Sequence, residues 1–176
     1  MFDYIINVSG YILEGSIVTF QLYFATAIFS VIVGIAGALG KISKIPLLES
    51  ILSVYTWIFR GTPLLLQLFF AYYGLPVLGI TLQPFPAAVL TFVINYGAYF
   101  TEIFRGGIES IDEGQYEAAK VLGMNYRQTM SRIVIPQTVK RVLPATSNEA
   151  INLVKDSALV AAVSYTHLTL PTKRIV

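Results

Sequence analysis

A long uncharged run near the start of the chain is the feature that most limits the possible folds. No Asp, Glu, Lys or Arg occurs in residues 15–40. At about 1.5 Å rise per residue, a helix of this length is longer than the hydrocarbon core of a bilayer, which is about 30 Å thick. The sequence therefore predicts a membrane-spanning helix here.

The composition extends this conclusion to the whole chain. Its 176 residues are 55% hydrophobic and only 12% charged, which is more apolar than a soluble domain of this size needs to be. A net charge of +2 gives no electrostatic reason to expect a nucleic-acid partner. The absence of cysteine excludes disulfides and thiolate chemistry. We therefore expect an all-α, polytopic membrane helical bundle.

Three further apolar segments follow, at about 47–75, 86–104 and 142–163. Pro63 interrupts the first of them, and because a proline in a spanning helix frees a backbone carbonyl, we expect a bend that neighbouring protein or water must satisfy. Lys155 and Asp156 are adjacent in the last segment, and because neighbouring residues on a helix do not face each other, a direct ion pair between them requires a helix break. Such a break is compatible with the segment, since broken helices at membrane depth commonly line cavities.

Small residues gather near the end of the first run. Gly34, Gly37, Ala38 and Gly40 favour close packing against a neighbouring helix, because packing drives helix association in lipid. The alternative is that glycine is simply common in membrane helices.

The basic residues predict the orientation in the membrane. Lys41 and Lys44 follow the first segment, and six more bases lie between the third and fourth segments. By the positive-inside rule both loops face the cytoplasm, and the N-terminus lies outside.

The cytoplasmic loop, residues 105–141, is too polar for lipid and reads as two short surface helices. Asp112 with Gln115 and Asn125 with Gln128 have the spacing of capping boxes. Gly123 is predicted to end the first helix, because glycine accepts the left-handed conformation.

This loop resembles the EAA loop in permease subunits of bacterial ABC importers. The resemblance rests on Glu117, Ala118 and Ala119, followed by Gly123 and by the Ile-x-Ile-Pro sequence of residues 133–136. Other motifs resemble the polar amino acid branch (His, Glu, Gln, Arg or opine): residues 60–67, 96–99 with Glu102, 105–108, 114–115, 122–124, 136–137 and 155–157. The resemblance covers roughly residues 10–163, which we expect to form one transmembrane domain of the type I importer permease kind.

The resemblance implies a set of partners and a docking surface. The loop would dock in a cleft of a separate ABC ATPase, and a second permease, identical or homologous, would pair with the chain. An extracytoplasmic amino-acid-binding protein would deliver the substrate. The chain itself would contact lipid in the bacterial inner membrane, which it would cross several times. The ATPase-docking candidates are Glu117, Ala118, Ala119, Gly123, Met124, Ile135 and Pro136. Glu117 can pair with a basic group of the ATPase, and the alanines allow close approach.

Polar side chains within spanning segments are costly, so each is a candidate for the substrate pathway. The candidates are Arg60, Thr62, Asn95, Tyr99, Glu102, Glu149, Asn152, Lys155 and Asp156. For Arg60 and Glu102 the alternatives are snorkelling at a helix end or a structural ion pair. Amides, hydroxyls and isolated charges can hold an amino acid zwitterion, but the choice of that substrate comes from the resemblance.

Catalysis is not expected of this chain. Gly40-Lys41 lacks the upstream glycine and the following Ser or Thr of a phosphate-binding loop, and His167 is the only histidine. We expect no catalytic residue, no cofactor and no metal site, with ATP hydrolysis by a separate protein. The alternatives are a permease for another small solute or, in a different class, a membrane enzyme or scaffold.

The resemblance stops after about Val163. Residues 164–176 contain no apolar run long enough to span a membrane and do not resemble the family. We expect them to be an artefactual or disordered tail. Permeases of this kind have a further spanning helix, so the resemblance implies a C-terminally truncated chain with about four of the usual five spans.

Overall fold

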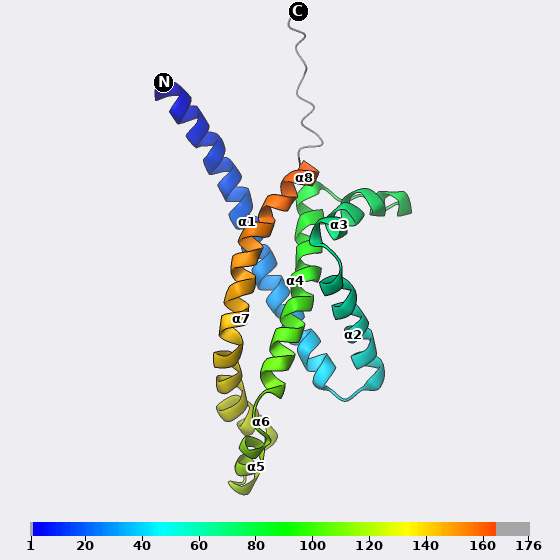
Figure 1. Cartoon of the computed structure of the whole chain (residues 1–176), viewed down its shortest axis with the longest axis vertical. Coiled ribbons are helices and arrows are strands. Elements are labelled where there is room, and N and C mark those ends of the chain that lie inside the picture. The colour runs from blue at the N-terminus through cyan, green and yellow to red at the C-terminus, as the bar shows by residue number, and fades with distance from the viewer. Residues whose placement is uncertain (1, 165–176) are drawn as a thin grey trace, which may run out of the picture.

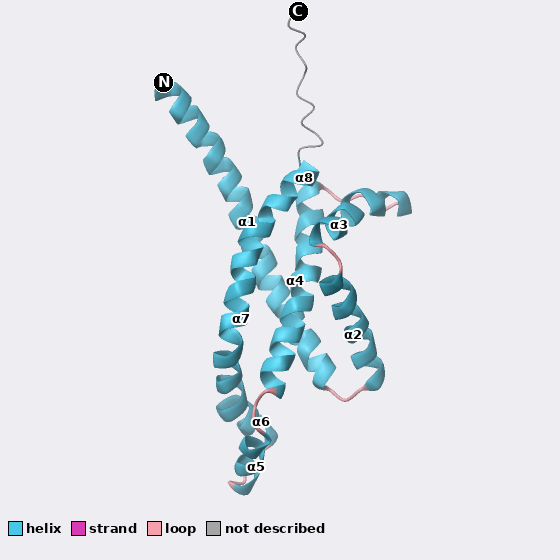
Figure 2. Cartoon of the chain, viewed as in Figure 1, coloured by secondary structure: helices cyan, strands magenta, loops and turns pink. Residues whose placement is uncertain are grey.

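In the computed structural model, residues 2–164 are described, and helices joined by short turns make up this range (Figure 1, Figure 2). The α-helices are α1 (Phe2–Ile42), α2 (Pro46–Gly61), α3 (Leu64–Phe69), α4 (Pro84–Glu109), α5 (Glu113–Val121), α6 (Tyr126–Thr129), α7 (Ile135–Asp156) and α8 (Ala161–Ser164). Two π-helical turns, η1 (Phe70–Gly74) and η3 (Met130–Val134), and two 3-10 turns, η2 (Leu75–Leu78) and η4 (Ser157–Val160), complete the set. The all-α prediction is confirmed, since residues 2–164 contain no strand.

Two helices are long and apolar enough to cross a membrane by themselves. They are α4 and the part of α1 from Gly15 to Ile42. The α2 helix and the turns from Leu64 to Leu78 count as a third span if taken together, but a bend of 104° separates them. The bend expected at Pro63 is therefore confirmed.

The fourth predicted membrane crossing, residues 142–163, stays a prediction. Within residues 2–164, α7 is not one of the helices that are long and apolar enough to span a membrane. Nevertheless α7 runs beside α1 and α4 for much of its length (Figure 1). Its α-helical hydrogen bonding ends at Asp156 and a 3-10 turn follows, so the hydrogen-bonding pattern changes at the point where the sequence allowed a helix break.

The most extensive helix packing is between α1 and α4. A Cβ atom added at Gly34 would collide with Phe100, and one added at Gly37 would collide with Thr101. Because these backbones approach so closely, only glycine fits at both positions. The predicted packing role of the small residues in the first run is confirmed.

The buried core lies where α1, α3, α4 and the end of α7 meet. Phe92 and Leu68 are completely buried, and Leu22, Leu153 and Val163 pack in the same cluster. This core fixes α4 in the centre of the bundle, with α1, α2 and α7 around it (Figure 1).

The predicted tail falls almost wholly outside the described residues. Only Ser164, the last residue of α8, is described. The domain boundary at residue 163 stays a prediction.

Candidate functional site

A polar cavity of about 460 Å³ lies between the α2–α3 break, α4 and α7. Seven of the nine predicted pathway residues line it: Arg60, Thr62, Asn95, Tyr99, Glu149, Asn152 and Asp156. They are far apart in the sequence and meet because α2 and α7 both pack along α4.

The cavity presents charges of both signs. The Arg60 guanidinium carbon lies 5.4 Å from the centroid of the Tyr99 ring, a cation–π geometry that holds the cation at the wall. Glu149 and Asp156, both from α7, contribute two carboxyl groups to the same cavity. The site can therefore offer a cation to an anionic group and a carboxylate to a cationic one.

Tyr96 is a wall residue that the pathway prediction missed. Its hydroxyl donates a hydrogen bond of 2.7 Å to Oδ2 of Asp156, joining α4 to α7 across the cavity. A signal for it was present, because Tyr96 and Tyr99 are three residues apart and so share a helix face. This contact orients Asp156.

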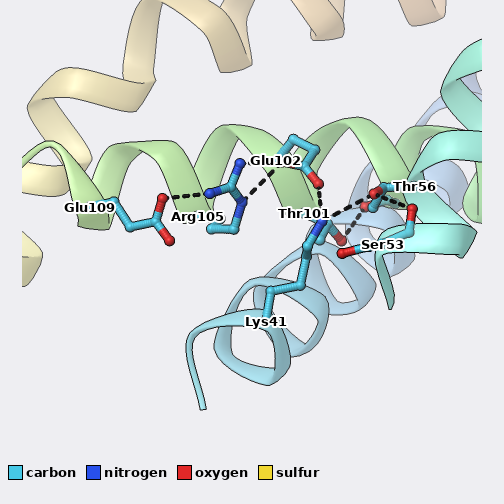
Figure 3. A network of polar contacts seen from close by, with 8 residues as sticks. Lys41, Ser53, Thr56, Thr101, Glu102, Arg105 and Glu109 are labelled. Carbon is cyan, nitrogen blue, oxygen red and sulfur yellow. Dashed lines mark hydrogen bonds and ion pairs between the residues drawn. The ribbon is translucent and has the colours of Figure 1, made fainter. Parts of the chain in front are cut away.

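Glu102 does not line the cavity. It lies in an ion network, where its carboxylate contacts Lys41 Nζ at 2.6 Å and Arg105 Nη2 at 2.7 Å (Figure 3). Lys41 also donates to the Thr56 hydroxyl on α2. Glu102 is thus a structural ion-pair residue, the alternative that the sequence left open.

Lys155 does not line the cavity either. Its side chain is exposed, whereas that of the adjacent Asp156 is half-buried and faces the cavity. Successive residues on a helix point about 100° apart, so only one of the two can face the same wall.

A helical knob, α5 with α6, protrudes at the end of the molecule far from α8 (Figure 1). Its second cap is the predicted one: Asn125 and Gln128 exchange backbone-to-side-chain bonds of 2.9 and 3.0 Å in a complete capping box. The capping box predicted for Asp112 and Gln115 does not form. Asp112 caps α5 by accepting from the Gly114 amide, while the Gln115 side chain instead contacts Gln137 at the start of α7.

Gly123 ends α5 as predicted. Its φ of +71° is in the left-handed region, its amide donates to the Lys120 carbonyl, and the Met124 amide donates back to the Ala119 carbonyl. These two bonds define a Schellman motif, which satisfies carbonyls at the helix end. The turn leads from α5 into the start of α6.

The docking candidates differ in exposure. Glu117, Ala118, Gly123, Ile135 and Pro136 are exposed, Met124 is half-buried, and Ala119 is completely buried. The side chain of Ala119 therefore packs beneath the knob surface and does not form part of it.

Exposed apolar side chains add to this surface. Val121 is 87% exposed and Leu122 75% exposed, next to the charged Glu117. Burial, together with the neighbouring Tyr126, raises the pKa of the Tyr116 phenol, so this side chain stays neutral at physiological pH. The surface thus combines apolar side chains with charges of both signs, since Lys120 and Arg127 are exposed as well.

The knob is tied to the spanning helices at its base. The Arg141 guanidinium of α7 donates to the Ser110 carbonyl just after α4, and Gly107 on α4 leaves room for Val142 on α7. These contacts hold the ends of α4 and α7 together at the base of the knob. Within residues 2–164, no three His, Asp or Glu side chains gather closely enough to hold a metal ion.

A helical membrane protein with a polar cavity between its long helices and a capped knob at one end has the architecture of a transport permease. Residues 28–172 match the family described as binding-protein-dependent transport system inner membrane component, and the chain belongs to this family. The match runs nine residues past the predicted boundary at residue 163.

Known proteins of this family are similar over most of the chain. The arginine transport system permease protein ArtQ of Bacillus subtilis is 44% identical over 154 residues, which are 87% of this chain and 70% of ArtQ. The L-cystine transport system permease protein TcyB of the same organism is 41% identical, over 86% of this chain and 65% of TcyB. A crystal structure of an amino acid ABC transporter with histidines superposes with a TM-score of 0.84 at 39% identity, over 93% of this chain and 76% of that chain.

Proposed function

We propose that this chain is the inner-membrane permease subunit of an ATP-driven importer of polar amino acids and forms part of its translocation pathway. The observation that carries this proposal is the cavity between α2, α4 and α7, where a guanidinium and two carboxyl groups face one space. The similarity to permeases named for arginine, cystine and amino acid transport supports the same substrate class.

The cavity suits a zwitterion. Arg60 can pair with the substrate carboxylate, because a guanidinium forms two parallel hydrogen bonds to that group. Glu149 can accept from the ammonium group, and Asn152 extends the polar wall beside it. The partial exposure of Arg60 and Glu149 keeps each attraction moderate, so substrate can leave as well as enter.

The knob docks a separate ATPase in this proposal. Val121 and Leu122 supply apolar contact area, Ala118 allows close approach, and Glu117 pairs with a basic side chain of the ATPase. ATP hydrolysis takes place in that partner. Gln137 on α7 donates to the side chain of Gln115 on α5 at 3.2 Å, and because this bond joins the knob to α7, displacement of the knob changes the walls of the cavity.

The remaining partners complete the importer. A second permease subunit, identical or homologous, forms the other half of the pathway, and an extracytoplasmic binding protein delivers the amino acid. The knob faces the cytoplasm and the N-terminus lies outside, as the distribution of basic residues predicts.

The docking step is tested by co-purification of the chain with its partner ATPase and by transport-coupled ATPase activity. Glu117→Lys reverses the charge at residue 117, so that like charges face each other across the proposed interface, which costs several kcal/mol. Gly123→Asp strains the left-handed turn, at a cost of roughly 1 to 2 kcal/mol. We expect each to lower coupled activity by about tenfold or more.

Glu49→Lys is the matched control, because it makes the same charge change at an exposed position in the first turn of α2, outside the knob. Full complex formation and coupled activity in both knob variants would refute docking through this surface. ATPase stimulation by a different class of solute, and not by amino acids, would refute the substrate assignment.

A further inference from the structure

The break between α2 and α3 leaves the Phe59 backbone carbonyl without its helical donor. In a continuous helix the carbonyl of Phe59 would accept from the amide of residue 63, four positions on. Residue 63 is proline, which has no N–H, and α2 ends at Gly61. A carbonyl at membrane depth needs another donor, because a bare one is costly where water is absent.

Two amide side chains supply that donor. Nδ2 of Asn95, on α4, donates to the Phe59 carbonyl at 2.7 Å, and Nε2 of Gln67, on α3, donates to it at 3.0 Å. Gln67 Nε2 also lies 3.1 Å from the Thr62 carbonyl. The two amides are joined to each other, since Asn95 Nδ2 donates to Gln67 Oε1 at 3.1 Å. We call Gln67 and Asn95 the amide brace.

The hydrogens of Asn95 are already used by these contacts. An amide nitrogen carries two N–H donors, and those of Asn95 go to the Phe59 carbonyl and to Gln67. Asn95 is 4% exposed, although it borders the cavity. Its amide nitrogen therefore has no hydrogen left to donate to a substrate.

The brace determines where two cavity residues lie. Arg60 follows Phe59 directly and Thr62 precedes Pro63, so both belong to the turn whose carbonyls the brace holds. Gln67 itself faces away from the polar cavity, into an apolar groove on the other side of the break. Gln67 Nε2 also donates to the Thr62 hydroxyl at 2.8 Å, so an effect of Gln67 on transport must act through the residues of the break.

We propose that Gln67 and Asn95 are positioning residues that hold the α2–α3 break and thereby place Arg60 and Thr62 at the wall of the cavity. This inference rests on the proposed function of the cavity as a substrate pathway. It assigns Asn95, which the sequence marks as a pathway residue, to the support of the pathway wall.

The test uses the assembled importer in proteoliposomes with Asn95→Leu, Gln67→Met and the double variant. Thr91→Val is the matched control, because Thr91 is buried on α4 one turn before Asn95 and its hydroxyl bonds only to the Ala87 carbonyl of its own helix. The half-saturating substrate concentration and the maximal rate per assembled complex are measured, together with the yield of complex.

Either single variant leaves the Phe59 carbonyl one donor, so we expect a two- to threefold rise in the half-saturating concentration, on the order of a few tenths of a kcal/mol. The double variant leaves none, and we expect a rise of about tenfold or more, larger than the product of the single effects. The maximal rate per assembled complex changes less, and Thr91→Val behaves as the unaltered chain.

A double effect equal to the product of the single ones would overturn the inference, because it would mean independent contacts. So would a Gln67→Met variant with an unchanged half-saturating concentration. Arg60→Ala separates this result from failure of the proposed function. If Arg60→Ala also leaves transport unchanged, the cavity is not the pathway; if it impairs transport while the double variant does not, only the brace is refuted.

Discussion

Two adjacent glycines near the end of α4, Gly106 and Gly107, differ in how closely other side chains approach them. A Cβ atom at Gly106 would meet nothing within 4 Å. At Gly107 it would collide with Val142 and lie 3.2 Å from Cγ2 of Thr138. Both residues are helical, so their intrinsic cost relative to alanine is the same. The difference between them is packing against α7 alone.

We therefore expect opposite effects from the same substitution at these positions. Gly107→Ala should lower the free energy of unfolding by about 1 to 2 kcal/mol, because overpacking outweighs the gain in helix propensity. Gly106→Ala should leave it unchanged or raise it by about 0.5 to 1 kcal/mol. Thermal unfolding of the detergent-purified chain measures both. Equal effects at the two positions would contradict the close approach of α4 and α7.

At the scale of elements, three helices are joined by one carboxylate. Glu102 on α4 contacts Lys41 at the end of α1, and Lys41 in turn donates to Thr56 on α2 (Figure 3). The side chains of Lys41 and Glu102 are 9% and 14% exposed. Such a pair adds little net stability over apolar residues, but loss of one partner leaves the other charge buried and unpaired.

Glu102→Gln should destabilise the chain by about 3 kcal/mol, because Lys41 loses its counter-charge in a buried position. Lys41→Met should cost less, since Arg105 still pairs with Glu102. The double variant should cost less than the sum of the two. Unfolding in detergent is the measurement, and additivity would argue against direct coupling.

Glu109→Gln serves as the control for this series. Glu109 also pairs with Arg105, but its side chain is 51% exposed. An exposed pair contributes at most about 1 kcal/mol, so this change should be the mildest of the set. A loss as large as that of Glu102→Gln would show that burial does not decide the difference.

For the whole molecule, the arrangement of the helices places the knob and the η2 turn at different ends of the bundle (Figure 1). The α2 helix turns by 104° into α3, so the residues after the break extend sideways from the bundle. Val77 in this region and Val121 in the knob are 84% and 87% exposed. In the proposed orientation they lie on opposite sides of the membrane.

Single cysteines test this orientation cleanly, because the chain has none of its own. In spheroplasts, a membrane-impermeant maleimide should label Val77→Cys at once and Val121→Cys only after lysis. Ile28→Cys, an exposed position within the spanning part of α1, should resist labelling in both states because lipid covers it. Labelling of Val121→Cys in intact spheroplasts would reverse the proposed topology.

Much of this protein is determined by local sequence. The uncharged residues 15–40 require a spanning helix, Pro63 requires a break, and Gly123 with Asn125 and Gln128 sets the turn in the knob. Each follows from backbone chemistry or from the cost of charge in lipid, which act within a few residues of the chain. The cost of polar groups in lipid also predicted most of the cavity residues, because they are polar side chains within apolar segments.

Only the tertiary structure decided what those polar residues do. Glu102 and Asn95 look alike in the sequence, as isolated polar side chains on one helix, yet one lies in an ion network with α1 and the other holds the broken α2. Their partners are 61 and 36 residues away, so no local pattern contains them. A polar group in a membrane must find a partner, but which partner it finds depends on how the helices pack.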